Sequence, residues 1–283
     1  SAASSRLLCL SSLACAKYAE LSADSPDLST LTRSASPYVV PETSAAGDTA
    51  SSGKRHALVF RHVPGGRELT FRMEDFLNRD TIEGHLLLTQ EPEESMVICT
   101  PFDKPGHFYY NQKINCMRAA GTVRIGGQTY TFDPADSFGV LDWGRGVWTY
   151  HNTWYWGSAS GQVDGVPFGW NIGYGFGDTS AASENMVFYD GKAHKLGQVT
   201  FHIPMAGKRE DYLAPWRFTS DDGRFEMDFA PILDRAACTD VKLIKSDQHQ
   251  VFGRFTGTAL LDDGTPVRVK DFLGFAEKVE NKW

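Results

Sequence analysis

The sequence predicts an all-β protein, an antiparallel meander of hairpins that closes into one barrel or two consecutive barrels, with few short helices. Three observations lead to this fold class. Short apolar runs are separated by two-residue turn signals, and the runs beside these turns alternate between apolar and polar residues. After Lys54, no window of about 12 or more residues keeps a helical apolar stripe. A chain of 283 residues can bury a large core in one such domain or in two.

Five turn signals separate predicted strands. Gly126-Gly127 lies between the apolar runs 122–125 and 129–132. Four Asp-Gly pairs repeat the pattern, at 164–165, 190–191, 222–223 and 263–264. Gly, Asn and Asp carry the least steric penalty at positive φ, and the primed turns that they form match the twist of antiparallel strands. We therefore predict a hairpin at each of these turns.

The flanks of the last two turns have a period of two. In the run 224–229, Phe and Met alternate with charged residues, and in the run 267–270 Val alternates with Arg and Lys. Such alternation is typical of half-buried strands. Two short stretches, Glu74 to Asn78 and Phe275 to Asn281, are predicted to form a turn or two of helix each.

The first residues of the chain allow two interpretations. The segment Arg6 to Lys17 lies in an acid-free beginning rich in Ser and Ala, and Ala14-Cys15-Ala16 resembles a small-residue cleavage site. It is either a targeting remnant or a terminal strand or helix with Leu7, Leu10 and Leu13 packed inward. We expect an intracellular protein, and the first interpretation would place it in an organelle such as the mitochondrion.

The composition then shifts along the chain. Between Asp24 and Lys54, Ser, Thr, Ala, Pro, Gly and Asp dominate, and only residues 38–40 form a short apolar knot. We predict a long connection in loop conformation there. The chain is accordingly divided into a divergent N-terminal segment (1–54) that forms part of the first barrel or leads to it, a first barrel portion (55–140) and a second barrel portion (141–283).

Composition and charge exclude several classes of protein. With 41% hydrophobic and 22% charged residues, the chain is neither disordered nor fibrous. The formal net charge is −7 and no stretch gathers Lys and Arg, so a nucleic-acid partner is not expected. No apolar run approaches the length of about 18 residues that spans a bilayer. Five scattered cysteines without a C-x-x-C pair predict reduced thiols rather than a disulfide framework: Cys9, Cys15, Cys99, Cys116 and Cys238.

Residues 136–185 contain five of the seven Trp together with many Gly. If 147–157 is one unbroken strand, five side chains share one face and form an aromatic wall, namely Trp148, Tyr150, Asn152, Trp154 and Trp156. In the next strand the aromatic face should hold Trp170, Ile172, Tyr174 and Phe176, and the opposite face Asn171, Gly173, Gly175 and Gly177. The glycine face leaves room for another sheet or for a ligand. The aromatic face is either plain core or the wall of an apolar cavity, and a buried indole N–H needs a partner in both cases.

Polar residues lie among these aromatics: Asp136, Asp142, Arg145, His151, Asn152, Asn171, Asp178, Glu184 and Asn185. A carboxyl buried in apolar surroundings must pair or shift its pKa, and it can then serve as a general acid or base. Asp142 and Arg145 flank Gly144, and a bulge there would bring them to one side. They would then form either a structural ion pair or a site in which Arg145 holds an anionic or carbonyl group while Asp142 orients it.

Other motif patterns are weak. Gly173-Tyr174-Gly175-Phe176-Gly177 does not open a βαβ unit, and the eight His show no ligand spacing. The Asp-Asp-Gly sequences at 221–223 and 262–264 lack the ligands of a calcium loop and are predicted to be turns. We expect no metal and no cofactor.

Five sequence blocks resemble the family known as domain of unknown function 2804. They are L-D-W-G-R-G-V-W-T-Y (141–150), W-Y-W-G-S-A-S-G (154–161), N-I-G-Y-G-F-G-D (171–178), E-N-M-V-F-Y-D-G-K-A-H-K-L (184–196) and H-Q-V-F-G-R-F-T-G (249–257). The resemblance is dense from about Asn115 to Trp283 and weaker before that. Residues 1–54 keep only traces of the pattern, which leaves open whether a first barrel would close.

The resemblance implies an all-β fold related to the lipocalin-like barrels (calycins), in the broad company of carotenoid hydratases and tocopherol cyclases. No activity comes with it. Seven residues match only as pattern positions without known roles: Asp142, Arg145, Trp148, Asn171, Glu184, Asn185 and His249.

Three hypotheses for function remain. In the first, a barrel enzyme protonates, hydrates or cyclises an apolar small molecule, with Asp142 or Glu184 as the acid and His249 as its partner. The ligand would contact Arg145, Trp148, Trp154, Trp156, Asn171 and Asn185. In the second, the same cavity carries a hydrophobic ligand without chemistry. In the third, the chain is a non-catalytic accessory subunit whose N-terminal segment docks on a protein partner.

Overall fold

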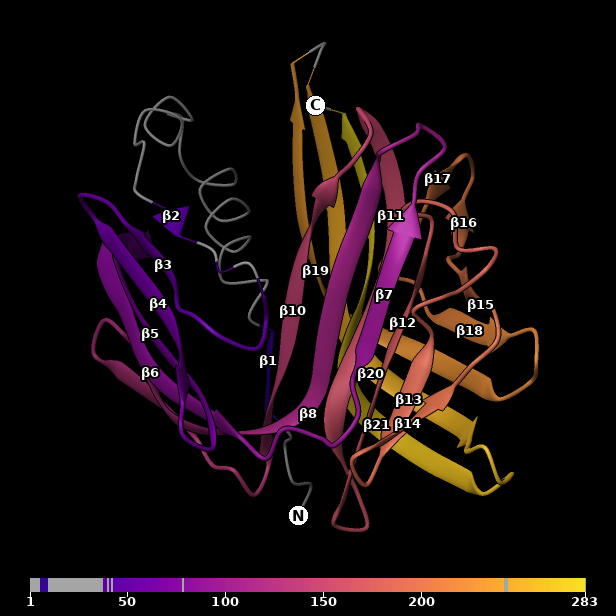
Figure 1. Ribbon diagram of the computed structural model, residues 1–283, viewed down its shortest axis with the longest axis horizontal. Coiled ribbons are helices and arrows are strands. Elements are labelled where there is room, and N and C mark those ends of the chain that lie inside the picture. The colour runs from indigo at the N-terminus through magenta and orange to yellow at the C-terminus, as the bar shows by residue number, and fades with distance from the viewer. Residues whose placement is uncertain are drawn as a thin grey trace. The chain divides into compact units, whose positions relative to one another are not determined.

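The computed structural model describes residues 6–9, 38–39, 41, 43–77, 79–241 and 244–282, and these residues form 21 strands and no helix (Figure 1). Paired strands run antiparallel throughout the registers determined for them, for example β11 with β12 and β20 with β21. The predicted all-β fold is confirmed. The relation to lipocalin-like barrels stays a prediction.

The chain divides into two compact units. Unit 1 comprises residues 1–91 and 117–139, and unit 2 comprises 92–116 and 140–283. Unit 2 thus contains the whole of the predicted second portion, 141–283, together with the segment 92–116, which the sequence division places in the first portion. Two long strands, β8 (Phe108–Ile125) and β10 (Ser137–Val147), contribute to both units.

Unit 1 is built from hairpins that share one sheet. Besides parts of β8 and β10, its strands are β1 (Arg6–Cys9), β2 (Tyr38–Val39), β3 (Thr49–Ser52), β4 (His56–Val63), β5 (Gly66–Leu77), β6 (Asp80–Thr89) and β9 (Gln128–Phe132). Alternate side chains of β5 and β6, such as Leu69 and Leu86, are buried. Phe71 packs over Gly84 in the facing strand, where a Cβ would lie 2.3 Å from the ring.

Two predictions for this unit are wrong. The expected loop from Asp24 to Lys54 contains β3, whose sequence Thr-Ala-Ser-Ser carries no apolar signal but pairs with β4 along its length. The expected helical turn at Glu74 to Asn78 is strand β5 as far as Leu77. A register shift between Met73 and Leu77, with φ of 52° at Asp75, interrupts the alternation there and hides the strand. Most of the N-terminal segment lies outside the described residues, but Arg6–Cys9 is a strand, as one of the alternatives proposed.

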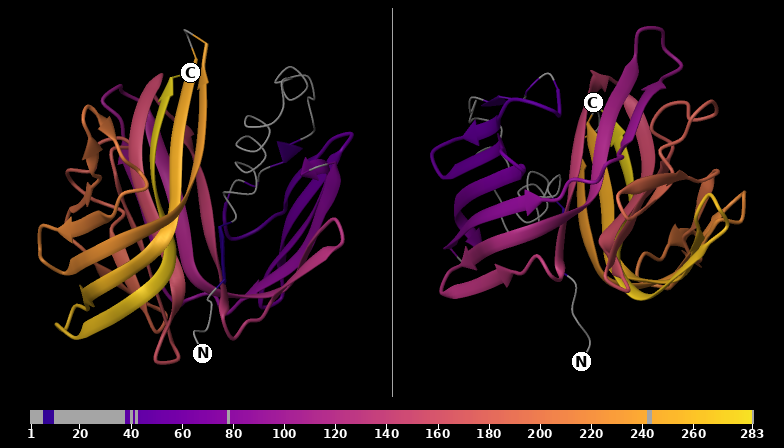
Figure 2. Two further views of the ribbon diagram at one scale, coloured as in Figure 1. Left: turned by 180° about the vertical axis from the view of Figure 1, so that it is seen from behind. Right: turned by 60° about the horizontal axis from the view of Figure 1, so that its bottom comes forward.

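Unit 2 is dominated by a nine-stranded sheet in the order β14-β13-β12-β11-β21-β20-β19-β18-β15. Its strands are β11 (His151–Val163), β12 (Val166–Tyr174), β13 (Met186–Tyr189), β14 (Lys192–Lys195), β15 (Val199–His202), β18 (Trp216–Ser220), β19 (Phe225–Asp240), β20 (Lys245–Leu260) and β21 (Pro266–Lys282). Figure 2 shows the orange to yellow strands curling around. The curl brings β15 near β12, where the Tyr174 hydroxyl accepts a hydrogen bond from the Phe201 amide at 3.4 Å. The sheet is a half-barrel.

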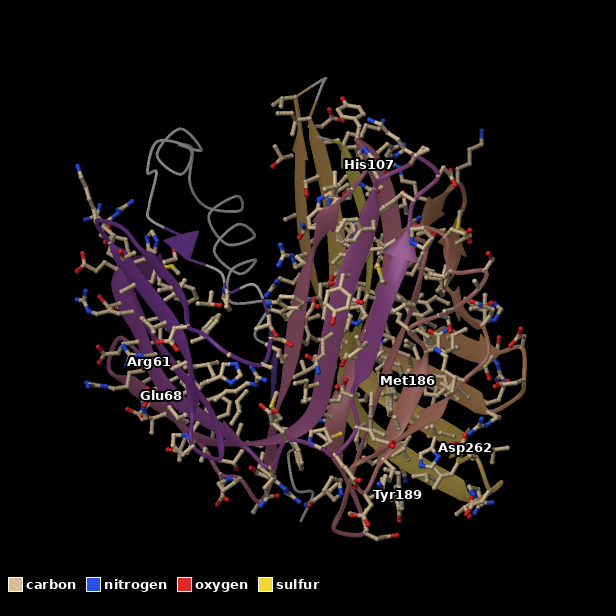
Figure 3. All side chains as sticks on the ribbon, in the orientation of Figure 1. Arg61, Glu68, His107, Met186, Tyr189 and Asp262 are labelled. Carbon is tan, nitrogen blue, oxygen red and sulfur yellow. The ribbon has the colours of Figure 1, made fainter. Side chains whose placement is uncertain are left out.

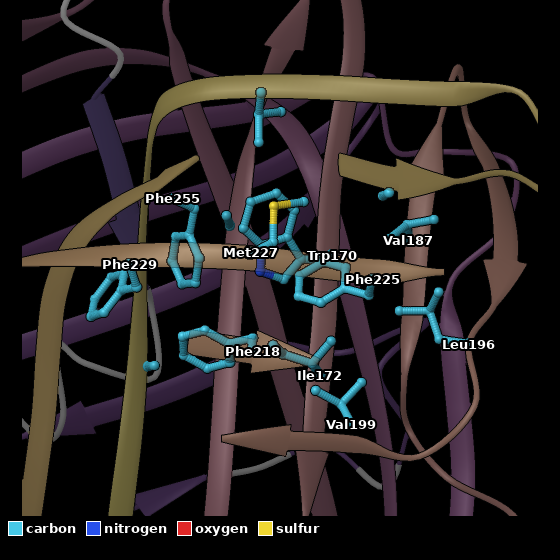
Figure 4. Packing of buried hydrophobic residues seen from close by; sticks show 14 of the residues in the cluster. Trp170, Ile172, Val187, Leu196, Val199, Phe218, Phe225, Met227, Phe229 and Phe255 are labelled. Carbon is cyan, nitrogen blue, oxygen red and sulfur yellow. The ribbon is translucent and has the colours of Figure 1, made fainter. Parts of the chain in front are cut away.

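The concave face of the half-barrel is filled by a dense aromatic core (Figure 4). Trp170, Phe218, Phe225, Phe229 and Phe255 are all at most 2% exposed. The rings of Phe229 and Phe255 lie 4.4 Å apart, and the rings of Trp170 and Phe255 lie 5.1 Å apart. The interior of the half-barrel is therefore packed core rather than a ligand cavity.

The convex face of the same sheet is covered in part by a second layer. This layer consists of β7 (Met96–Pro101), the first part of β8 and the last part of β10. Asn115 of β8 donates hydrogen bonds to the Ser158 hydroxyl and the Trp170 carbonyl, each at 2.9 Å. The candidate functional residues lie between these two layers. A small separate hairpin of β16 (Met205–Ala206) and β17 (Arg209–Glu210) completes unit 2.

All five predicted hairpins are present. At 164–165 and 190–191 both turn residues have positive φ, as a primed two-residue turn requires. The helical turn predicted at Phe275 to Asn281 is wrong, because this segment is part of β21. Its inward side chains include the polar residues Glu277 and Asn281, which are buried, so polarity no longer marks the exposed face.

Candidate functional site

A buried lysine stands at the centre of the interlayer space. Lys113 of β8 is 4% exposed, and its Nζ lies 3.0 Å from Oδ1 of Asp142 on β10 and 3.8 Å from the ring centre of Trp156 on β11. Burial is the largest effect on the pKa of Lys113 and acts to lower it, but the charge and hydrogen bond of Asp142, together with Tyr109 and Glu184, outweigh burial and raise the pKa above its ordinary value. Lys113 is therefore a fixed positive charge inside the protein.

A buried carboxyl lies beside this lysine. Glu277 of β21 is 8% exposed; its Oε1 accepts a hydrogen bond from Trp154 Nε1 at 2.9 Å, and its Oε2 accepts one from Gln250 Nε2 at 2.8 Å. Burial raises the pKa of Glu277 to about 7, although these two hydrogen bonds and the charge of Lys113 act to lower it. A carboxyl of this kind can both give and accept a proton near neutral pH.

An amide network fixes the neighbouring strands. Trp156 Nε1 donates to Asn171 Oδ1 at 2.7 Å, and Asn171 Nδ2 donates to Glu184 Oε2 at 3.0 Å. Asn185 accepts a hydrogen bond from the Gly173 amide at 2.7 Å and donates one to the Gly197 carbonyl at 3.0 Å. The space beside Gly173 is taken by Glu184, because a Cβ there would lie 2.6 Å from Glu184 Oε1.

Five aromatic rings lie at one end of the group formed by Lys113, Asp142 and Glu277. We call them the ring cluster: Phe102, Tyr109, Trp148, Trp154 and Phe176. The Phe176 ring contacts the other four, at centroid distances from 4.9 to 5.9 Å. None of the five side chains is fully buried, so the cluster offers an apolar surface that solvent reaches. His107, labelled in Figure 3, contacts the Trp148 carbonyl through Nδ1 at 3.1 Å.

Two residues link the ring cluster to the charges. The Trp154 ring contacts Phe176 while its indole N–H reaches Glu277. The hydroxyl of Tyr109 lies near Asp142 and Lys113, and burial together with the charge of Asp142 raises its pKa. Gly144 allows this position, because a Cβ there would lie 2.6 Å from the Tyr109 hydroxyl.

The structure brings together six of the nine predicted site residues. Asp142, Glu184, Trp154, Trp156 and Asn171 surround Lys113 or Glu277, and Trp148 lies in the ring cluster. Asn185 supports the backbone of β12. The indole N–H groups of Trp154 and Trp156 have the partners that we expect them to need, whereas the buried N–H groups of Trp143 and Trp170 have none among the described residues.

Arg145 and His249 lie elsewhere. Arg145 is exposed and stands three positions from Asp142 on β10, so the two side chains point to opposite faces, and Asp142 pairs with Lys113 instead. His249 is one position from Gln250, on the concave side, where its Nδ1 lies 2.7 Å from Asp234 Oδ2 and its ring stacks on Tyr212 at 3.7 Å. The structure thus separates His249 from Asp142 and Glu184.

The expected unbroken strand at 147–157 is also wrong. β10 ends at Val147 and β11 begins at His151, because the Asn152 side chain closes a turn with the Thr149 carbonyl at 2.5 Å and hydroxyl at 3.0 Å. β12 likewise ends at Tyr174. Gly175, with φ of 94°, turns the chain, and Phe176 joins the ring cluster instead of the face of Trp170.

Sequence reasoning missed Lys113 and Glu277. Lys113 stands between Asn111 and Asn115 at period-two spacing, and this polar row within a long strand was the available signal. Glu277 lay in the stretch that we assigned to helix. The site forms because the strands pair in register, which places Trp156 and Gln250 directly opposite Glu277 on the neighbouring strands.

A hollow elsewhere in unit 2 lacks this chemistry. An open hollow of about 630 Å³ lies between the end of β12 and the start of β15, lined by residues that include Tyr174, Asp178 and Val199, and none of the charged residues around Lys113 lines it.

Within the described part of the chain, no three His, Cys, Asp or Glu side chains gather as metal ligands. No helix among the described residues is long and apolar enough to cross a membrane.

The family model described as "Domain of unknown function (DUF2804)" matches residues 17–283. The chain belongs to this family. The match confirms the resemblance in the sequence, and it also includes most of the segment 1–54. No curated protein sequence matches the chain.

Three solved structures are similar over most of their length. They are the crystal structure of CghA with Sch210972 (11% identity, 87% of this chain and 73% of that chain, TM-score 0.46), that of kievitone hydratase from Nectria haematococca (9%, 88% and 87%, 0.38) and that of a putative AttH from Nitrosomonas europaea (15%, 80% and 70%, 0.45).

Proposed function

We propose that the chain binds an apolar, unsaturated small molecule against the ring cluster and transfers a proton to it from Glu277. The single observation that carries this proposal is the environment of Glu277. Its carboxyl is buried between Trp154 and Gln250, beside the Lys113–Asp142 ion pair, and its pKa is raised to about 7. Half of such groups hold a proton at neutral pH, which suits a general acid.

The chemistry follows from the neighbours of this carboxyl. The Glu277 proton passes to one carbon of a double bond, and the positive charge that develops on the other carbon is stabilised by the face of Trp154. The resulting carboxylate is stabilised by Lys113 and by the two hydrogen bonds that it accepts. It then takes a proton back, either from a water molecule that adds to the cation or from a C–H beside it, so that the acid is regenerated.

The other predicted residues have supporting roles in this proposal. Asp142 keeps Lys113 charged, and Glu184 and Asn171 hold the Trp156 indole in place. Arg145 and His249 take no part in it, because their side chains lie on other faces.

Native mass spectrometry of the full chain, purified gently from its own source, tests the binding step. We expect a co-purifying apolar molecule of defined mass. The isolated molecule is then returned to the protein in D₂O, where proton transfer to carbon adds deuterium to it. The E277Q variant should abolish this incorporation. The matched E280Q variant, which changes a carboxyl on the same strand but the opposite face, should keep it.

The outcomes separate the hypotheses. A bound molecule without deuterium incorporation would make the chain a carrier rather than an enzyme. A chain that carries no small molecule but arrives within a larger assembly would contradict both of these functions and favour an accessory subunit.

A further inference from the structure

The row of side chains that holds Glu277 continues to an arginine. Arg235 on β19 pairs across the sheet with Gln250 on β20, and Gln250 pairs with Glu277 on β21. Residues directly opposite each other in antiparallel strands point to the same face. Two strand spacings separate the backbones of Arg235 and Glu277 by about 10 Å. Arg235 is therefore part of the same convex surface.

Among the described residues, none forms an ion pair that balances the charge of Arg235. Its Nε atom is buried and lacks an acceptor, and among the described residues it is the one Arg or Lys with such a nitrogen. Arginine stays charged throughout the physiological pH range and offers five N–H donors. A buried donor without an acceptor destabilises the folded state, so a guanidinium held in this way suits an anionic oxygen supplied from outside.

An apolar strip runs beside this polar row. Leu233, Phe252 and Phe275 occupy the adjacent cross-strand row, and the rings of Phe252 and Phe275 lie 5.9 Å apart. Phe275 is fully buried, Phe252 is half-buried and Leu233 is 55% exposed. The strip thus leads from solvent at Leu233 towards the interior next to Glu277.

We infer that Arg235 binds an anionic group of the ligand and that the substrate is an apolar molecule with a carboxylate or a similar oxyanion. The unsaturated end of the ligand lies between the ring cluster and Glu277, and its apolar body continues along Phe252 and Leu233. Gln250 then separates the anion from the reacting carbon at Glu277. This inference rests on the proposed function, since it names the substrate class of the same site. The separation of the two backbones places the anion on the order of 10 Å from that carbon.

Two fluorescent probes test the inference with the full chain. 8-Anilinonaphthalene-1-sulfonate is apolar and anionic, and N-phenyl-1-naphthylamine is its neutral counterpart without the sulfonate. We expect the R235Q variant to bind the anionic probe about tenfold more weakly and the neutral probe unchanged, because only the charge-assisted hydrogen bonds are lost. R235K, which keeps the charge without the planar fork, should lie between R235Q and the wild type.

The control is R268Q, which removes an exposed arginine from β21 and should leave the binding of both probes unchanged. Unaltered binding of the anionic probe by R235Q would overturn the inference, and so would an equal loss of both probes. In either case, binding of the neutral probe by the wild type keeps the proposed function standing. A wild type that binds neither probe contradicts the proposed function itself.

Discussion

Replacement of Glu277 by Gln should change how the stability of unit 2 depends on pH. Glutamine keeps the shape of the side chain and an oxygen that can accept the Trp154 indole N–H, but it has no proton to lose. In the wild type, burial raises the pKa of Glu277 from the ordinary 4.5 to about 7. Between these two values the folded protein holds a proton that the unfolded chain has released.

The sign and size of the effect follow from this difference. Because the folded state binds the extra proton, raising the pH through this window opposes folding. At about 1.4 kcal/mol per pH unit, the pKa change from 4.5 to about 7 corresponds to a total loss of about 3 kcal/mol of unfolding free energy. About 2.5 kcal/mol of this loss falls between pH 5 and pH 8.5. The E277Q variant should lack that part of the decline.

Urea denaturation at several pH values measures the effect. Six tryptophans lie among the described residues of unit 2 and none among those of unit 1, so tryptophan fluorescence reports the unfolding of unit 2. The stability of E277Q relative to the wild type should increase by about 2.5 kcal/mol from pH 5 to pH 8.5. E226Q, which changes a partly exposed carboxyl paired with Arg217, serves as the control and should show no such increase. Parallel pH curves for E277Q and the wild type would refute the burial of an ionisable Glu277.

Two further predictions concern the packing around this carboxyl. Lys113→Met removes a positive charge that lowers the pKa of Glu277, so a carboxyl titration followed by NMR should show the Glu277 pKa moving upward; a lower or unchanged value would contradict the contact. Gly173→Ala places a Cβ 2.6 Å from the Glu184 carboxylate and should cost about 1–3 kcal/mol of stability in urea denaturation. Gly127→Ala, with open space around its Cβ, should cost far less, and equal losses would show that the close approach at Gly173 is relieved.

Local signals in the sequence predicted much of the fold. The Asp-Gly and Gly-Gly turns located five hairpins, because the demand for positive φ is a property of the turn residues themselves. Period-two alternation predicted the buried side of β19 at Phe225, Met227 and Phe229. Alternation did not predict strands whose buried side chains are polar or whose residues show no apolar pattern. β21 looked helical because Glu277 and Asn281 are buried, and β3 looked like a loop because strand pairing rather than apolar content holds it.

The candidate site depended on information that a single sequence does not contain. The aromatic and polar residues of 136–185 were visible as a set, and the sequence showed that Trp154 and Trp156 need hydrogen-bond partners. The tertiary structure supplied those partners: Glu277 lies 123 positions from Trp154, and Lys113 comes from a strand of the covering layer. The pKa of a carboxyl depends on burial and on the nearest charges, and both are fixed by which strands pair and which layers pack. Composition and turn chemistry therefore determine that this chain forms sheets, whereas only the packing of the sheets decides which carboxyl is buried and has its pKa raised.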